Sequence, residues 1–404
     1  MVGVETVDCS TAAEFLSAIT LSGPAPRKHG YDFLLFRGVA SGSGSQEYKL
    51  VPSALRPDNF PFLSRLAGFS LAPVESRDKY AQLEWIQGRC EADVVASFFR
   101  FADMHGLPVP EVGIEVRRTM QLPSTSGALF YDGILNGGVW PPDNLLPMIG
   151  LAQHYGLPTR LLDWSRDALT AAYFAATGAL RRVQRGESMH AAENRLAVWI
   201  FNAELLDFIQ RMTLPHSKKL PNIPVSFVTA PAASNPNLRA QQGVFTVWRP
   251  QMTDREHQQV DRRPLNELID ECLERDGVEL PSLLLFYKVT LPLAEAPTLL
   301  HLLLRTGVTA ARLFPGYEGA AEAVREWSRR QPIDWPWRPF EVSYDKGKDR
   351  FDTDLLTACL QYVTRGNPGS EHESAEAALR DIRGRLSVFA ENLDIQERRD
   401  EPLT

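Results

Sequence analysis

The stretch Leu151-Ala-Gln-His-Tyr-Gly-Leu-Pro-Thr-Arg-Leu-Leu-Asp-Trp-Ser-Arg-Asp-Ala-Leu-Thr-Ala-Ala-Tyr-Phe-Ala-Ala176 joins the end of one apolar segment to an alanine-rich one through a polar connection. Between Gln153 and Trp164 it contains Gln, His, Tyr, Thr, Arg, Asp and Trp side chains. A turn needs Gly, Pro, Asn and Asp, because those residues satisfy turn geometry, and it does not need this set. The stretch therefore predicts a binding site.

Hydrophobic periodicity around this stretch predicts an α+β fold, with a central mixed or antiparallel sheet flanked by helices. We expect one domain over residues 1–330 and a small helical extension over residues 331–404, in which residues 353–363 and 373–392 form helices. In the main domain, helices are expected at residues 76–105, 145–155, 167–180 and 299–306, and strands at residues 31–36, 196–201, 225–229, 244–248 and 283–289.

Composition is that of an ordinary soluble globular protein. Of the 404 residues, 44% are apolar and 23% charged, and the net charge of −7 gives no general sign of nucleic-acid binding, although a local basic face stays open. No apolar run approaches the roughly 20 residues that cross a bilayer, and the N-terminus is unlike a secretory signal. The four cysteines are far apart and form no CxxC pair. We expect a reduced, cytoplasmic protein with no metal and no membrane contact.

Arg37 stands where an apolar strand meets Gly38. A guanidinium supplies paired donors for a phosphate or a carboxylate, and a glycine lets a ligand approach the backbone closely. The alternative is an arginine that forms a salt bridge at a strand end and binds no ligand.

His154 and Tyr155 end the helix expected at residues 145–155, beside Gly156. Adjacent side chains point in different directions around a helix end, so one or two of Gln153, His154 and Tyr155 can face the same cleft. We expect His154 to face it, and the alternative is a structural histidine.

Thr159, Arg160 and Asp163 form the centre of the expected site. Trp164 offers a flat apolar face that suits a purine or nicotinamide ring, and Ser165 caps a helix whose N-terminus suits an anion. Alternatively, Arg160 and Asp163 form a structural ion pair with each other and Ser165 is only a cap.

Gln241 and Gln242 precede a glycine and a strand. Two adjacent amides can bind a base edge or a ribose. The alternative is a β-bulge in which both amides satisfy local backbone groups.

Six motifs together resemble the FRG domain family, from about residue 30 to 327. In chain order they are Phe36-Arg37-Gly38, Leu50-Val-Pro-Ser-Ala-Leu-Arg56, Gln153-His-Tyr-Gly-Leu-Pro-Thr-Arg-Leu-Leu-Asp-Trp164, Ala171-Ala-Tyr-Phe-Ala175, Arg239-Ala-Gln-Gln-Gly-Val-Phe245 and Leu313-Phe-Pro-Gly316. FRG domains are widespread in bacteria and phages, and some occur in anti-phage defence and toxin-like settings.

The layout is also similar to that of ADP-ribosyltransferases, an analogy at the level of the fold. It implies NAD as cofactor, with Arg37 on the pyrophosphate and with Trp164 and Tyr155 around the nicotinamide. Those enzymes carry a catalytic glutamate on a third strand, where this chain has Gln241 and Gln242 and no acid between residues 207 and 254. Asp163 or His154 would then act on the ribose, or the domain binds a nucleotide without chemistry.

Three functions follow from these features. The first is an NAD-using transferase or glycohydrolase, a toxic effector in phage defence with a protein or nucleic-acid acceptor. The second is a sensor that recognises a nucleotide or a phage component and signals through the C-terminal helices. The third is a nuclease-like hydrolase, suggested by the small basic clusters at Arg181, Arg182, Arg185, Lys218 and Lys219.

Overall fold

The computed structural model divides the chain into two compact units, residues 1–331 and 332–404. In the second unit, strands β8 (Ser343–Asp345) and β9 (Arg350–Asp352) form an antiparallel pair, and the helices expected at 353–363 and 373–392 lie outside the described residues. The structure describes residues 4–20, 23, 25, 34–44, 47–67, 83–111, 113–121, 138–213, 220–229, 236–251, 259–278, 284–328, 343–345 and 350–352.

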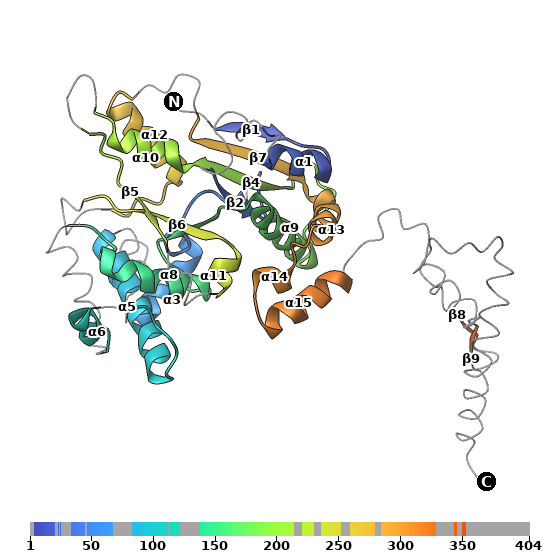
Figure 1. The fold of residues 1–404 in the computed structure, drawn as a ribbon, viewed down its shortest axis with the longest axis horizontal. Coiled ribbons are helices and arrows are strands. Elements are labelled where there is room, and N and C mark those ends of the chain that lie inside the picture. Colours follow the sequence, from blue (N-terminus) through green and yellow to red (C-terminus); the bar gives the residue numbers. More distant parts are fainter. Residues whose placement is uncertain are drawn as a thin grey trace, which may run out of the picture. The chain divides into compact units, whose positions relative to one another are not determined.

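A seven-stranded mixed sheet forms the centre of the first unit (Figure 1). Strand β1 pairs parallel with β7, and every other pairing in this sheet is antiparallel. The α+β fold expected from the sequence is therefore confirmed. In spatial order the strands are β1 (Glu5–Asp8), β7 (Phe286–Pro292), β4 (Arg195–Asn202), β2 (Leu34–Val39), β3 (Leu162–Ser165), β6 (Gly243–Trp248) and β5 (Val225–Val228).

Twelve α-helices of the described residues surround the sheet. They are α1 (Ala12–Ile19), α3 (Phe60–Leu66), α5 (Glu84–Met104), α6 (Ile114–Gln121), α8 (Leu146–His154), α9 (Ala168–Gln184), α10 (Ala203–Arg211), α11 (Pro236–Ala240), α12 (Leu265–Arg275), α13 (Ala296–Arg305), α14 (Ala310–Leu313) and α15 (Tyr317–Ser328).

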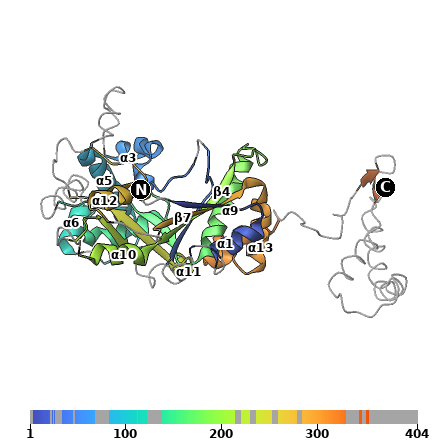
Figure 2. The same ribbon diagram turned by 90° about the horizontal axis from the view of Figure 1, so that it is seen from above.

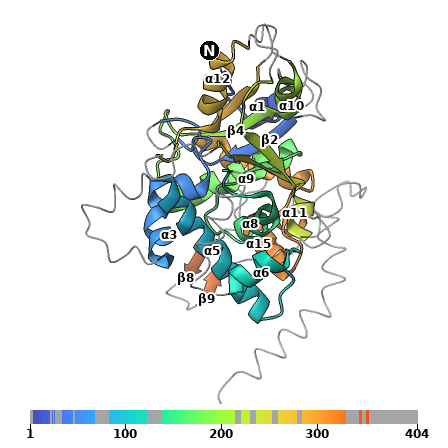
Figure 3. The same ribbon diagram turned by 90° about the vertical axis from the view of Figure 1, so that its left-hand side faces the viewer.

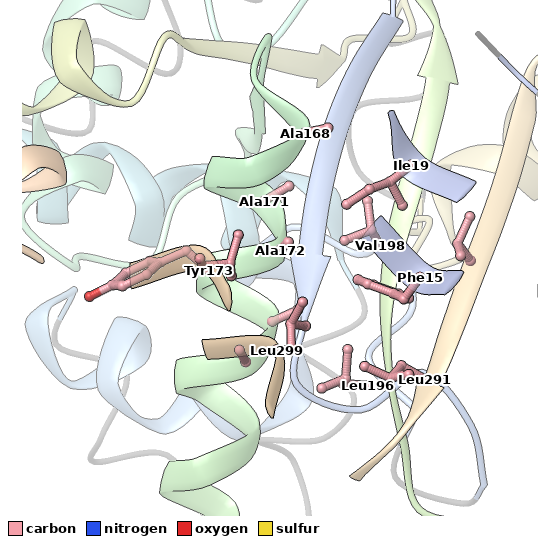
Figure 4. Close-up of a cluster of buried hydrophobic side chains, with 14 of the residues drawn as sticks. Phe15, Ile19, Ala168, Ala171, Ala172, Tyr173, Leu196, Val198, Leu291 and Leu299 are labelled. Carbon is pink, nitrogen blue, oxygen red and sulfur yellow. The ribbon is translucent and has the colours of Figure 1, made fainter. Parts of the chain in front are cut away.

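Strands β2, β4 and β7 are covered on both faces, which explains why β4 is apolar almost without interruption. Helices α1, α9 and α13 pack on one face, and they lie together beside β4 and β7 in Figures 1 and 2. Figure 4 shows this core, with Phe15 and Ile19 of α1 opposite the alanines of α9. Helices α10 and α12 pack on the other face.

The β3–β6–β5 side of the sheet has a core of its own. Helices α5, α6 and α8 bury apolar side chains against β5 and β6, and with α3 they form the helical group seen in Figures 1 and 3. Residues 151–176 pass from α8 through β3 into α9. The stretch that suggested a site therefore connects the core beside β5 and β6 to the core beside β4 and β7.

The β2–β3 ladder is the shortest in the sheet, because it consists of one residue pair, Phe36 opposite Ser165. Strand β2 pairs with β4 over its whole length, and β3 pairs with β6 over its whole length. The sheet thus consists of two fully paired sections, β1–β7–β4–β2 and β3–β6–β5. The two sections diverge beyond the Phe36–Ser165 pair.

Residues 162–165, which are not among the strands expected from periodicity, form β3, whose side chains alternate between the core and the open side. The strand expected at residues 31–36 begins its described part at Leu34 and extends to Val39, and residues 31–33 lie outside the described residues.

Gly38 lets α9 cross β2 at close range. A Cβ atom at this position would overlap the carbonyl oxygen of Ala171 and lie 2.8 Å from the amide nitrogen of Ala175. The close approach that Gly38 permits is to helix α9, and this helix–strand contact gives a physical reason for a glycine at this position, which also lines the cavity described below.

We expect Gly38→Ala to lower the free energy of unfolding by about 2 kcal/mol or more, because backbone atoms cannot yield as a flexible side chain can. Urea denaturation followed by circular dichroism measures this change. Gly113→Ala is the matched control, because a Cβ atom there would meet nothing within 4 Å. Equal stability of the two variants would refute the packing role of Gly38.

Candidate functional site

A cavity of about 370 Å³ lies where β2 and β3 part. Apolar side chains form much of its wall, and polar groups converge on it from β2, β3, α8 and the segments before α3 and β6. The polar residues that line it are Arg37, Ser53, Arg56, Gln153, His154, Asp163, Ser165 and Gln241.

Arg37 bridges the two parted strands. Its Nη1 atom donates to the backbone carbonyl oxygen of Asp163 at 2.7 Å and lies 2.5 Å from the carboxylate Oδ1 of the same residue. Its Nε atom is buried and has no hydrogen-bond partner in the described part of the chain. The guanidinium thus joins β2 to β3 and keeps one buried donor uncommitted.

Asp163 is the single acid among the described residues that line the cavity. The Asp163 side chain is 59% exposed, and the protein atoms around it would raise the pKa of its carboxyl group, but the Arg37 guanidinium outweighs this desolvation and brings the pKa below its ordinary value. The carboxylate is therefore ionised at neutral pH, with Oδ1 held by Arg37.

Gln153 fixes the same carboxylate from α8. Its Nε2 atom donates to Asp163 Oδ1 at 3.2 Å and to the Leu161 carbonyl oxygen at 3.1 Å, and its Oε1 atom accepts a hydrogen bond from the Thr159 hydroxyl. Both ends of the amide are thereby used within the protein. Thr159 and Gln153 position Asp163, and Thr159 itself is buried outside the cavity wall.

Arg56 and Ser53 belong to the site, although the sequence analysis did not select them. Arg56 lines the cavity and donates from Nε to the Val51 carbonyl oxygen at 3.1 Å. Burial and the nearby Arg37 guanidinium lower its pKa. The motif of residues 50–56 was the one available signal, but nothing in its spacing indicates that it faces Arg37.

His154 lines the cavity, as the sequence analysis expected. Burial lowers the pKa of its imidazole, so the ring is neutral at neutral pH. It makes edge-to-face contact with Tyr155, with 5.3 Å between the ring centroids. A neutral imidazole at the cavity wall can accept a proton.

Arg160 does not line this cavity. Its Nε atom donates to Glu91 at 2.7 Å, and its Nη1 atom pairs with Glu84, in a site where all three side chains are buried. Glu91 also accepts from the indole of Trp140 at 2.8 Å. The expected alternative in which Arg160 pairs with Asp163 is wrong, because the two arginines divide the acids: Arg160 takes Glu84 and Glu91, and Arg37 takes Asp163.

The two aromatic rings expected around a nicotinamide do not form a sandwich. Trp164 is among the residues that line the cavity, but its indole is buried beside Phe201 and donates to the Thr246 hydroxyl at 2.9 Å. Tyr155 is exposed, contacts Phe98 and does not line the cavity. The alternation of β3 explains the position of Trp164, because its neighbour Asp163 takes the open side.

Ser165 lines the cavity, but Asp167 is the N-cap of α9. The Asp167 carboxylate accepts from the Leu169 amide at 3.0 Å, and the Ser165 hydroxyl donates to the Gln241 carbonyl oxygen at 2.7 Å. The helix N-terminus that was expected to bind an anion is thus already occupied by an acidic side chain.

The two glutamines before β6 have different surroundings, because only Gln241 lines the cavity. Gln241 lines the cavity and donates from Nε2 to the Leu313 carbonyl oxygen at 3.1 Å. Gln242 does not line the cavity and adopts a left-handed conformation with φ of 49°. Its carbonyl oxygen accepts from the Arg166 amide at 3.1 Å. It serves the turn into β6, which favours the local-backbone alternative for this residue.

The described residues contain no group of three or more His, Cys, Asp or Glu side chains that could hold a metal ion. None of their helices is both long and apolar enough to cross a membrane.

We expect the Asp163 carboxyl group to titrate below the ordinary aspartate value of about 3.9, and Arg37→Met to raise its pKa, because burial then acts without its counter-charge. Carbon-13 NMR of the aspartate carboxyl carbons measures this pKa directly. Arg181→Met, which removes an exposed guanidinium from α9, should leave it unchanged. An unshifted Asp163 titration in Arg37→Met would contradict the assignment.

We expect Arg160→Met to lower the free energy of unfolding by about 3–5 kcal/mol, because it leaves two buried carboxylates without the guanidinium that pairs with both of them. Urea denaturation near neutral pH measures the loss. Adding Glu84→Gln in the same chain should restore part of the stability, since it removes one of the two unpaired charges. A loss below about 1 kcal/mol would show that the network is not structural.

The FRG domain model matches residues 133–183, which include α8, β3 and most of α9. No curated protein and no solved structure matches the chain. The wider extent of the domain, from about residue 30 to 327, stays a prediction. The matched segment supplies Gln153, His154 and Asp163 to the cavity. The chain therefore contains an FRG domain, and that domain carries the central residues of the candidate site.

Proposed function

We propose that the cavity binds a nucleotide, with NAD as the first candidate, and that the protein is an ADP-ribosyltransferase-like or NAD-cleaving effector of bacterial anti-phage defence. The observation that carries this proposal is the Arg37–Asp163 pair at the wall of the cavity. A guanidinium binds phosphate oxygens, and a carboxylate beside it accepts a hydrogen bond from a ribose hydroxyl. The FRG domain supports the setting in defence.

The cavity residues can be assigned to the parts of NAD by the groups that they offer to a ligand. Arg37 Nε and the Arg56 guanidinium face the pyrophosphate, whose negative charge they balance. The Asp163 carboxylate, which lines the cavity, accepts from the ribose. The apolar wall for the ring comes from Phe174 and Phe314, whose centroids are 6.0 Å apart, in place of Trp164 and Tyr155.

The chemistry breaks the bond between ribose C1′ and the nicotinamide nitrogen. Nicotinamide leaves with the bonding electron pair, and the positive charge that develops on the ribose ring is stabilised by the Asp163 carboxylate. Water, or an acceptor nucleophile, then forms a bond to C1′. His154 is neutral and takes the proton that this nucleophile loses.

A second candidate is a nucleotide sensor without catalysis. The observation that favours it is that Asp163 is already neutralised by Arg37 and is the single acid of the described cavity wall. A carboxylate in such a pair stabilises a developing positive charge less than an unpaired one. Binding without turnover would then be signalled elsewhere in the chain.

We expect the purified full-length chain to release nicotinamide from NAD in proton NMR spectra. Asp163→Asn should lower the rate by about 100-fold or more while NAD signals still broaden, because the charge on the ribose loses its counter-charge but the phosphate donors remain. Arg37→Ala should abolish both broadening and release.

Arg181→Ala is the matched control, since it removes an exposed arginine of α9 and should change neither readout. Full turnover in Asp163→Asn would remove Asp163 from the catalytic role. Broadening without turnover in the unmodified chain would support the sensor. Neither broadening nor turnover would overturn NAD as the ligand.

A further inference from the structure

Three exposed arginines, Arg166, Arg239 and Arg312, lie close together in three different segments. The Arg166 amide donates to the Gln242 carbonyl oxygen, and the Gln242 amide donates to the Arg239 carbonyl oxygen, both at 3.1 Å. Helix α11, which carries Arg239, contacts α14, which carries Arg312, and Figure 1 shows the two helices side by side.

These arginines adjoin the cavity. Each stands one or two positions along the chain from a residue that lines it, and the side chain of Gln241 ties two of the segments together by its hydrogen bond to the Leu313 carbonyl oxygen. The neighbouring cavity residues are Ser165, Leu238 and Phe314. The three arginines therefore stand on the segments that form one side of the cavity.

The positive charge of this group is poorly compensated. Arg166 and Arg239 form no ion pair within the described residues. Arg312 lies 3.9 Å from the Asp167 carboxylate, at the limit of an ion pair, and that carboxylate already accepts from the Leu169 amide. Glu318 is an exposed acid nearby on α15. Three guanidinium groups therefore meet few acids, in a chain whose net charge is −7.

Tyr317 adds an exposed aromatic ring to this surface. It is 97% exposed and begins α15, three residues after Phe314 of the cavity wall. Guanidinium groups that contact phosphates, together with an aromatic face on which a base can stack, are the features by which proteins bind single-stranded nucleic acid. An acidic peptide would use the arginines but would have no need of the ring.

We propose that Arg166, Arg239, Arg312 and Tyr317, the arginine–tyrosine patch, bind single-stranded nucleic acid beside the cavity. This binding does not depend on NAD chemistry. One consequence does rest on the proposed function: if the cavity cleaves NAD, a nucleic acid on the patch lies where an acceptor would receive the ADP-ribosyl group.

The basic cluster suggested by the sequence lies elsewhere and is partly committed. Arg182 donates to the Ala40 carbonyl oxygen at 2.6 Å and pairs with Glu187. Lys218 and Lys219 lie outside the described residues. Arg181 and Arg185 are exposed on the far end of α9 and serve as controls for the patch.

Fluorescence anisotropy with the full-length chain, without NAD, tests the patch. The probes are labelled oligo(U) RNA and oligo(dT) DNA of about 15 nucleotides, a duplex of equal length and polyglutamate. We expect both single strands to bind more tightly than the duplex and polyglutamate. Replacing Arg166, Arg239 and Arg312 together by Gln should weaken binding at least about tenfold and reduce the salt slope by about 2, because each phosphate contact on a single strand contributes about 0.7.

Tyr317→Ala should weaken binding about tenfold while Tyr317→Phe should not, because stacking needs the ring and not the hydroxyl. A control chain with Arg118, Arg181 and Arg185 replaced by Gln loses the same charge from exposed positions elsewhere and should bind as the unmodified chain does. Thermal melts confirm that every variant is folded. No binding of single strands, equal loss in the control chain, or polyglutamate binding as tight as RNA would each overturn the proposal. Because no readout uses NAD, failure here is distinct from failure of the proposed function.

Discussion

The Arg37–Asp163 pair is the interaction on which the architecture of the site depends. Beyond Phe36 and Ser165 the two parts of the sheet have no backbone ladder, and the Arg37 side chain joins them there. Arg37 does so with one nitrogen that donates to both the carbonyl and the carboxylate of Asp163. Because the folded-state pKa of Asp163 is depressed, this contribution to stability is present above the ordinary aspartate pKa and is lost as pH falls through the folded value.

A second ion cluster holds the far side of β3 in place. Arg160, three residues before Asp163, is buried with Glu84 and Glu91 of α5, and burial raises the pKa of Glu84. Such a cluster contributes little net stability, but it tolerates only one arrangement, because any unpaired member is costly. The segment is therefore fixed to α5 by Arg160 and to β2 by Asp163.

The sequence was sufficient for the fold class, the long helices and the general location of the site, because these depend on local periodicity and on unusual polar density. The roles of neighbouring residues were harder to predict, since they depend on which face of β3 each side chain takes. Asp163 takes the open side of β3, as a site residue must, while the indole of its neighbour Trp164 enters the core instead of offering a face to a ligand ring. Arg56 was missed for a related reason: its proximity to Arg37 arises from tertiary packing, and no spacing in the chain encodes it.

The polar atoms that remain uncommitted constrain the ligand more strongly than the full set of lining residues does. Gln153 and Gln241 line the cavity, but their donors already serve Leu161, Asp163 and Leu313. The groups that can meet a ligand are guanidinium donors, the Asp163 carboxylate and a neutral imidazole. A matching ligand must therefore carry an anionic group beside a hydroxyl donor, and a phosphorylated sugar has both. An uncharged ring alone would leave Arg37 Nε buried without a partner, which costs free energy that the apolar wall would have to offset.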